Sequence, residues 1–473
     1  MKKTLFIIFA AASALLLSCQ KGFDGGDSSL RELRFEAGSS DFTKSHYNGT
    51  GRQEWSYGDR MNVFDGYGKR SFLTYTSGAT ASFCGPVAAD ASSIVAVYPE
   101  SAANAYLSAT SVAVGFPVMQ IASKGGFTDG SNPMVGKAPI SDNISMDMRN
   151  VGSYLEFTIP DGTGIDLSSV YIVSGGEEML SGVIPVDVSG DTPVASAGSG
   201  YHNVALVPDA ESDHIAPGTY FAVVPPVTLA SGLSFVAKRT DGKVGVKSGT
   251  TSNTLVRNAS KNLGTIDISA MEWSDAEEFS DLTMTLDFSS ASVFTEALPS
   301  SKTIGTKTYK TPDGKLFTIS IDDSNSNTRG PGWMVSDGRF VMFNNSYYRE
   351  SPLSTTTDGI TLPSFPALRL KSVTIDVGKS NTFQAVVLNP DGSLVKGGMD
   401  EDATNWQKGT THTLALKGTQ PGVSYKICAK AANTFIYIAK LTLTYERLGL
   451  SVPTQNPTGS IADITDNGDI FVW

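Results

Sequence analysis

Five side chains in the last third of the sequence combine flat aromatic faces with polar groups. Sugar recognition needs this combination, because aromatic rings cover the apolar C–H faces of a sugar and a few fixed polar groups bind its hydroxyls. Trp333 follows glycine and proline residues, which favour an exposed loop. The candidate ligand-binding residues are Trp333, Tyr347, Tyr348, Arg349 and Trp406. The alternative is a core position for each ring, which is the commoner place for aromatic residues in β-sandwiches.

Motifs of enzymatic chemistry are missing from the sequence. It contains no Gly-x-Ser-x-Gly elbow, no complete Gly-x-x-x-x-Gly-Lys-Ser/Thr loop and no His-Glu-x-x-His. The run Asp323–Asn327 begins like a calcium loop, but Thr328 replaces the required glycine and Met334 the required glutamate. We therefore expect no enzyme, no metal and no cofactor. A pair of glycosidase carboxylates stays open as an alternative, since acidic residues are plentiful.

Length and composition restrict the class of protein. A chain of 473 residues predicts about three domains. Its hydrophobic content of 40% is enough to bury several cores, which argues against a disordered chain. The net charge of −11 argues against a nucleic-acid partner, because such proteins present a basic face.

The N-terminus has the pattern of an export signal. Two lysines precede the apolar run Leu5–Leu17, which is too short to cross a bilayer, since a spanning helix needs about 20 residues. A Leu-Leu-Ser-Cys motif ends at Cys19 and is similar to a bacterial lipobox, in which the cysteine is lipidated and the preceding peptide removed. We expect lipidation at Cys19, which would attach the chain to a membrane. Ordinary secretion with a chance cysteine is the alternative.

Alternation of apolar and polar residues dominates the chain and predicts strands. Tyr154–Ile159 alternates cleanly and stops at a Pro-Asp-Gly turn sequence. Leu30–Ala37 is the first predicted strand, and no long amphipathic helix is apparent. Short strands separated by Gly, Pro and Asn turns are typical of β-sandwiches. The predicted fold class is therefore all-β, with two tandem transthyretin-like β-sandwiches and a C-terminal β-sandwich or jelly roll.

Shifts in composition divide the chain into segments. An acidic stretch around Trp273 predicts a linker ahead of the last domain, and the polar tail ends in an apolar Ile470–Trp473 run that suits a docking or donor segment. The expected segments are a signal peptide (1–18), a tether (19–29), two sandwiches (30–150 and 151–270), an acidic linker (271–281), a jelly roll that is a possible carbohydrate-binding module (282–447) and a tail (448–473).

Several short motifs follow one another through residues 30–268. They are Trp55–Phe64, Val95–Pro99, Phe116–Gln120, Asn150–Gly152 and Asn262–Gly264. In order and spacing they resemble the fimbrillin-like proteins of Bacteroidales. The resemblance implies the two transthyretin-like sandwiches, export as a lipoprotein and a role as a pilus subunit or surface adhesin. It places the chain at the outer membrane, lipid-anchored at the cell surface, or in a fimbrium.

The resemblance also implies a route of assembly. In fimbrillin-like proteins a trypsin-like protease cuts after a basic residue in the loop that follows the first strand. That strand leaves, and a strand of another subunit fills the groove. Here the leaving strand is Leu30–Ala37, and the candidate cleavage residues are Arg52 and Lys44. The family commonly has Arg, so Lys44 departs from its pattern and Arg52 is favoured. The alternative is that both are solvated loop charges and no cut occurs.

The strand rhythm of residues 279–447 carries a second resemblance. Its segments are Leu286–Phe288, Ile360–Pro363, Leu368–Thr374 and Ala439–Glu446. They resemble the galactose-binding-like jelly rolls appended to Bacteroidales surface proteins, which implies a host or dietary glycan as a partner. The combined expectation is a lipid-exported fimbrial subunit, at a tip or accessory position, that joins other fimbrial subunits by donor-strand exchange. The alternative is a monomeric surface glycan-binding lipoprotein that does not polymerise.

Overall fold

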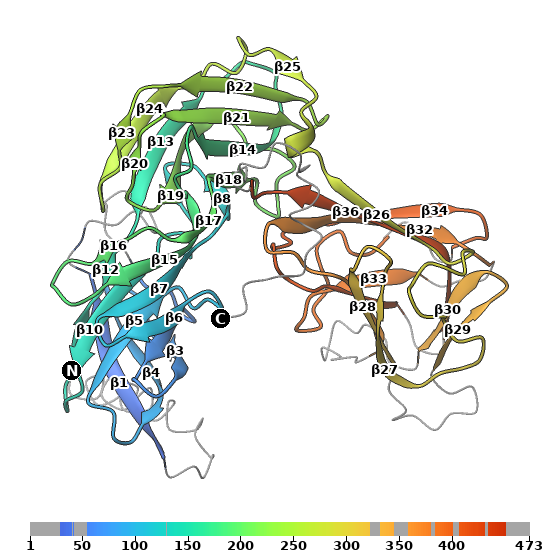
Figure 1. Ribbon diagram of the computed structural model, residues 1–473, viewed down its shortest axis with the longest axis horizontal. Helices are drawn as coiled ribbons and strands as arrows, with labels where there is room; N and C mark the ends of the chain where they lie inside the picture. The colour runs from blue at the N-terminus through green and yellow to red at the C-terminus, as the bar shows by residue number, and fades with distance from the viewer. Residues whose placement is uncertain are drawn as a thin grey trace, which may run out of the picture.

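The computed structural model describes residues 29–39, 41, 54–128, 130–321, 332–344, 358–379, 384–400, 406–430 and 434–450. These residues form strands, turns and a short 3-10 helix, η2 (Glu277–Phe279), so the predicted all-β class is confirmed (Figure 1). Within the described ranges, no helix is long and apolar enough to cross a membrane.

The first sandwich is one eight-stranded sheet whose two ends are joined by a single short segment. Across the sheet the strands are β11 (Ser145–Asp147), β1 (Leu30–Gly38), β4 (Thr80–Ala88), β3 (Lys69–Thr74), β2 (Arg60–Phe64), β5 (Ser93–Tyr98), β10 (Met134–Pro139) and β12 (Arg149–Asn150). Because β11 pairs with β1 while β12 pairs with β10, residues 145–150 close the sheet on itself. Gly136 permits this closure, since a Cβ there would lie 2.7 Å from the Met146 side chain.

Aromatic rings fill the space inside the closed sheet. The Trp55 ring meets Phe83 and Tyr98 edge-on, each at a centroid distance of 5.1 Å. Phe35 of β1 lies 5.5 Å from Phe72 of β3. Inward residues alternate with outward ones along each strand, as the pleat requires. The alternation in the sequence therefore marks the core side of this domain.

The segment between residues 105 and 127 leaves the first sheet and pairs with later strands. One sheet joins β6 (Ala105–Ser108) and β7 (Ser111–Phe116) to β15 (Ser181–Asp187), β16 (Val194–Ala195) and β17 (Ser199–Tyr201). Val112 and Val114 of β7 pack against Val95 and Val97 of β5, so this small sheet covers the outer face of the first one. The predicted boundary at residue 150 is wrong for this segment, because periodicity gives the buried face of a strand and not its partner.

The second sandwich packs a seven-stranded sheet against a three-stranded one around a separate core. The larger sheet contains β25 (Trp273–Ser274), β22 (Val244–Gly249), β21 (Leu233–Arg239), β14 (Leu167–Ser174), β18 (Asn203–Val207), β8 (Met119–Ser123) and β9 (Gly126–Phe127). The smaller sheet contains β19 (Gly218–Val224), β13 (Ser153–Ile159) and β24 (Ser260–Thr265), and β20 (Thr228–Leu229) pairs with β23 (Asn253–Thr254) beside it.

The C-terminal domain is a sandwich of two sheets around one large core. The first sheet contains β29 (Gly332–Ser336), β30 (Arg339–Asn344), β36 (Thr434–Arg447), β32 (Leu368–Val377) and β34 (Thr411–Ala415), with β26 (Leu282–Asp287) also paired to β36. The second contains β27 (Gly305–Lys310), β28 (Leu316–Ile321), β31 (Gly359–Thr361), β35 (Lys426–Ala429) and β33 (Ala385–Leu388). The narrower description as a jelly roll stays a prediction.

The stretch predicted to be an acidic linker is a packed junction. Its Phe279 is buried, with its ring 5.0 Å from Tyr171 of the second sandwich. Asp281 accepts hydrogen bonds from Lys238 and Lys371, at 2.8 and 2.7 Å, so it ties the second sandwich to the C-terminal domain. The start of the predicted tail docks there too, since Asn203 donates to the Leu448 carbonyl. These contacts place the C-terminal domain beside the second sandwich (Figure 1).

Candidate functional site

Strand β1 closes the first sandwich and is held unequally on its two sides. Its ladder with β4 runs its full length, from Leu30 opposite Ala88 to Gly38 opposite Thr80. The described ladder with β11 covers only Glu36, Ala37 and Gly38. The first part of β1 therefore depends on β4 and on core packing. Loss of β1 would leave the edge of β4 with unpaired backbone groups.

The inward face of β1 fills an apolar groove. Leu33, Phe35 and Ala37 are 7%, 1% and 0% exposed, whereas the residues between them point outward. The Phe35 ring lies 6.1 Å from Phe83 of β4, in a stacked arrangement. A fully buried phenylalanine contributes about 1.5–3 kcal/mol through burial of its side chain. Any strand that replaced β1 would need apolar residues at the same alternate positions.

Asp41, just beyond the end of β1, lies in a site with several hydrogen-bond donors. Its Oδ1 accepts from Arg149 at 3.2 Å, and its Oδ2 accepts from Arg257 at 2.5 Å and from the backbone N–H of Asn150 at 2.9 Å. The carboxylate side chain is 6% exposed. Burial alone would raise the pKa of Asp41, but the hydrogen bonds and charge of Arg257, with those of Arg149 and Asn150, hold the pKa below its ordinary value.

A chain of hydrogen-bonded amide side chains supports the Asp41 site. Asn132 donates to the Asn150 side chain at 2.8 Å, and Asn150 donates to Asn258 at 2.7 Å. Arg257 also donates to the Asn150 carbonyl at 2.8 Å. Asn258 adopts a left-handed φ of 57°, which asparagine tolerates better than most residues. Because Arg257 belongs to the second sandwich and Arg149 to the first, this site exists only where the two sandwiches meet.

Sequence reasoning missed the Asp41 site. It predicted the strand ahead of Asp41 but had no signal for Arg149 and Arg257, which are far from it along the chain. The predicted lipidation residue Cys19 and the predicted cleavage residues Lys44 and Arg52 lie outside the described residues. Their roles stay predictions.

The structure corrects the expectation that Trp333 lies on an exposed loop. Trp333 is on β29 and is 0% exposed, with its ring 5.4 Å from Tyr309 in an edge-on arrangement. β29 pairs with β30 along its length, and two backbone hydrogen bonds with Thr303, of 3.0 and 3.1 Å, hold Trp333 on its other side, despite the neighbouring glycine and proline. Its face is in the core and is closed to a sugar.

Trp406 is also a core residue. It is 0% exposed and stacks on His412 at 4.5 Å, while its indole N–H donates to Asp400 at 3.3 Å. The expectation that it offers a free ring to a ligand is therefore wrong. The remaining candidates, Tyr347, Tyr348 and Arg349, lie outside the described residues.

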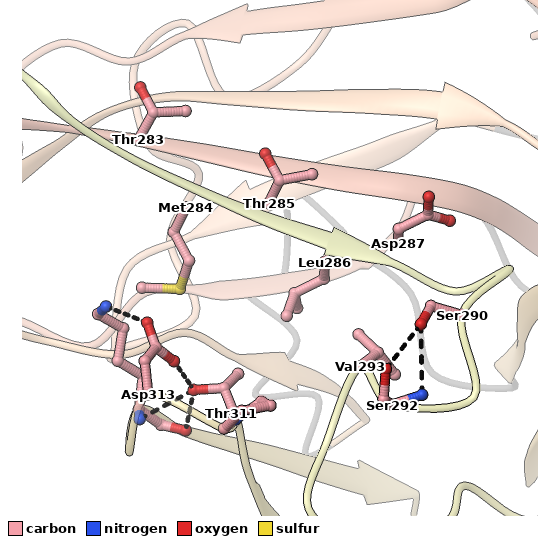
Figure 2. A pocket seen from close by; sticks show the side chains of 12 residues that line it. Thr283, Met284, Thr285, Leu286, Asp287, Ser290, Ser292, Val293, Thr311 and Asp313 are labelled. Atoms are coloured by element: carbon pink, nitrogen blue, oxygen red, sulfur yellow. Dashed lines mark hydrogen bonds and ion pairs between the residues drawn. The ribbon is translucent and has the colours of Figure 1, made fainter.

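A shallow hollow lies along β26 of the C-terminal domain (Figure 2). Met284 and Leu286 point into it, whereas Thr283, Thr285 and Asp287 point the opposite way from the same strand. Its lining is completed by Ser290, Ser292, Val293, Thr311, Pro312, Asp313 and Lys315. None of these described lining residues is aromatic, so the hollow lacks the flat face that sugar stacking needs. Elsewhere in the described ranges, no cluster of His, Cys, Asp or Glu has the arrangement of a metal site.

Comparison with known proteins gives likenesses in structure alone. No family model and no curated protein matches the sequence. A candidate cell adhesion protein from Bacteroides uniformis is 17% identical, with 51% of this chain and 95% of that chain covered and a TM-score of 0.33. The tip fimbrial protein Mfa3 from Porphyromonas gingivalis is 12% identical, with 52% and 98% covered and a TM-score of 0.22. The xylan-binding module CBM86 from Roseburia intestinalis is 11% identical, with 35% and 96% covered and a TM-score of 0.19. These likenesses are too distant to decide function.

Proposed function

We propose that this chain is a cell-surface adhesion protein of the fimbrial type. It is exported with a lipid on Cys19, and its first sandwich accepts a strand from a neighbouring subunit. The observation that carries the proposal is β1, which fills an apolar groove yet is fully paired only with β4. The basic residues Lys44 and Arg52 stand between β1 and β2 in the sequence, where a cut would free β1 from the rest of the chain.

Strand replacement fits the physics of this groove. Removal of β1 would leave unpaired N–H and C=O groups along β4 and an open slot for alternate apolar side chains. A donor strand would satisfy both, because it supplies ladder hydrogen bonds and inward side chains together. Without a replacement strand, the closed sheet would lack the packing that Phe35 makes against Phe72 and Phe83. The empty groove is therefore a strong site for an incoming strand.

The placement of the C-terminal domain suits a tip or accessory position. It lies beside the second sandwich, away from β1 (Figure 1). A partner strand can enter the first sandwich without meeting it. We assign the adhesive role to this domain. The rival proposal of a monomeric glycan-binding lipoprotein loses support, because the rings of Trp333 and Trp406 are buried.

N-terminal sequencing of protein extracted from the cell surface tests the proposal. Cleavage after Arg52 gives a chain that starts at Gln53, and cleavage after Lys44 gives one that starts at Ser45. Processed chains should form ladders of higher mass on a denaturing gel run without boiling. A variant with Arg52→Gln and Lys44→Gln should keep β1 and form no ladders. Recovery of the wild-type chain with lipidated Cys19 as its sole N-terminus would contradict the proposal.

A further inference from the structure

Asp41 belongs to the part of the chain that would depart with β1. It lies three positions beyond Gly38 and ahead of both candidate cleavage residues. A cut at either place therefore removes Asp41 from the site formed by Arg149, Arg257 and the N–H of Asn150. The departing segment therefore carries the carboxylate, and the rest of the chain carries the groups that bind it.

Departure of Asp41 would leave the site with excess positive charge. Arg149 would keep its ion pair with Asp147, at 2.8 Å, and Arg257 would keep its hydrogen bond to the Asn150 carbonyl, at 2.8 Å. The bonds that both guanidinium groups and the Asn150 N–H make to the Asp41 carboxylate would be lost. A half-buried donor left without its acceptor is costly, and more so when it is charged.

We propose that Arg149, Arg257 and the backbone N–H of Asn150 form a carboxylate-binding site that selects the strand replacing β1. The ligand is an Asp or Glu side chain of a partner strand, placed at the Gly38 end of the groove. This inference rests on the proposed function, because it concerns the strand that enters after β1 leaves. What it adds is that the incoming strand must carry a negative charge at this end of the groove.

The occupant is therefore an extended peptide with two features. Apolar residues at alternate positions replace Leu33, Phe35 and Ala37, and an acidic residue replaces Asp41, four positions after the last of them. The apolar positions give affinity to any strand of suitable pattern. The carboxylate adds discrimination, because two arginines and a backbone N–H surround a single acceptor group.

A strand-exchange experiment tests the site. The full chain receives one engineered protease site between Asp41 and Glu54, is cleaved, and is incubated with labelled peptides spanning Leu30–Asp41. The native peptide is compared with one carrying Asp41→Asn. We expect the Asn peptide to bind at least about tenfold more weakly, which corresponds to about 1.4 kcal/mol. Asn keeps the shape of the side chain but lacks its charge.

A double-mutant comparison assigns the effect to the site. In a chain with Arg257→Gln, the preference for the Asp peptide should shrink several-fold, because the Arg257 contact is gone and, of the two arginine contacts, only the longer one with Arg149 remains. The matched control is Arg60→Gln, an exposed arginine on β2, which should keep the full discrimination. Equal binding of the Asp and Asn peptides to the wild-type body would overturn the carboxylate site while strand replacement stands.

Two further outcomes separate the site from the proposed function. If neither peptide enters the cleaved chain, strand replacement fails and the site proposal falls with it. If Arg257→Gln does not fold, the uncut chain with Asp41→Asn replaces it. Amide hydrogen exchange in β1 should then speed up by about tenfold, because the end of the strand has lost its anchor. Unchanged exchange would overturn the site.

Discussion

Asp41 gives the first sandwich a defined dependence on acid. Its carboxylate is buried among donors, and these donors keep its pKa below the ordinary value of about 3.9. A carboxyl group with a lowered folded-state pKa stabilises the fold above its unfolded pKa, and this stability is lost as the pH falls through the folded value. The contribution of Asp41 is therefore complete near neutral pH and declines below about pH 4.

The Asp41→Asn variant should show directly how the contribution of Asp41 to stability depends on pH. At pH 7 we expect it to be less stable than the wild type by about 2 kcal/mol, because charged hydrogen bonds are lost in a buried place. At pH 3 the gap should narrow, since protonation begins to weaken the wild-type contact as well. Urea unfolding at pH 7 and at pH 3 measures the difference in the free energy of unfolding between the two proteins. Asp161→Asn, in an exposed turn, is the matched control, and a gap of equal size at both pH values would contradict the account.

Individual tryptophans show the limit of residue-level reasoning from sequence. The glycine and proline before Trp333 predicted a loop, but β29 pairs with β30 along its length, and a bridge to Thr303, some thirty positions earlier in the sequence, holds its other side. Local composition states what the backbone permits, and pairing with other segments decides what it does. The Asp41 site was out of reach for the same reason, since its ligand and its two arginines come from three separate segments.

Strands were predictable as elements, and their partners were not. The alternation at Leu30–Ala37 predicted a first strand, and β1 is Leu30–Gly38. Strand β5 is buried on both faces, because one face lies in the core of the first sandwich and the other packs against β7. The pairing of β7 with β15 and of β8 with β18 could not be predicted from the sequence, because the alternation in a strand is the same whichever sheet it joins.

The register of β1 against β4 supplies a test of strand departure. Arg34 is the direct partner of Cys84 in this ladder. Opposite residues of antiparallel strands have Cα atoms about 4.5–5.5 Å apart, which is within the range of a disulfide. Arg34→Cys should therefore form a bond to Cys84 under oxidising conditions and hold β1 in place. Assembly ladders should disappear and should return after reduction.

The matched control for this lock is Arg34→Ser, which removes the arginine and cannot form the bond. It should assemble like the wild type with or without oxidant. Ladders that persist in the Arg34→Cys variant, when mass spectrometry shows that its engineered disulfide to Cys84 is complete, would show that β1 need not leave. Donor-strand exchange at this groove would then be wrong.

At the scale of the whole molecule, the acidic stretch before the last domain fastens two domains together. Composition predicted a linker, because five acidic residues surround Trp273. The structure uses one of them, Asp281, as a bridge between Lys238 and Lys371. The Lys238 side chain is 4% exposed, and its ammonium group donates to Asp281 and to the Phe279 carbonyl, each at 2.8 Å. The number of acidic residues in a stretch does not show whether their carboxylates are solvated or form ion pairs between domains.

Asp281→Ala should loosen the junction and leave each sandwich folded. A buried ammonium group that loses its carboxylate costs about 2 kcal/mol, and the cost falls on the contact between domains. Limited proteolysis should then cut near residues 271–281 faster than in the wild type, and X-ray scattering should show a wider spread of domain positions. The control is Asp275→Ala in the same stretch, because the pair of Asp275 with Lys243 is exposed and contributes little. Equal proteolysis of the two variants would mean that packing of Phe279 and Leu448, and not the ion pair, holds the C-terminal domain in position relative to the second sandwich.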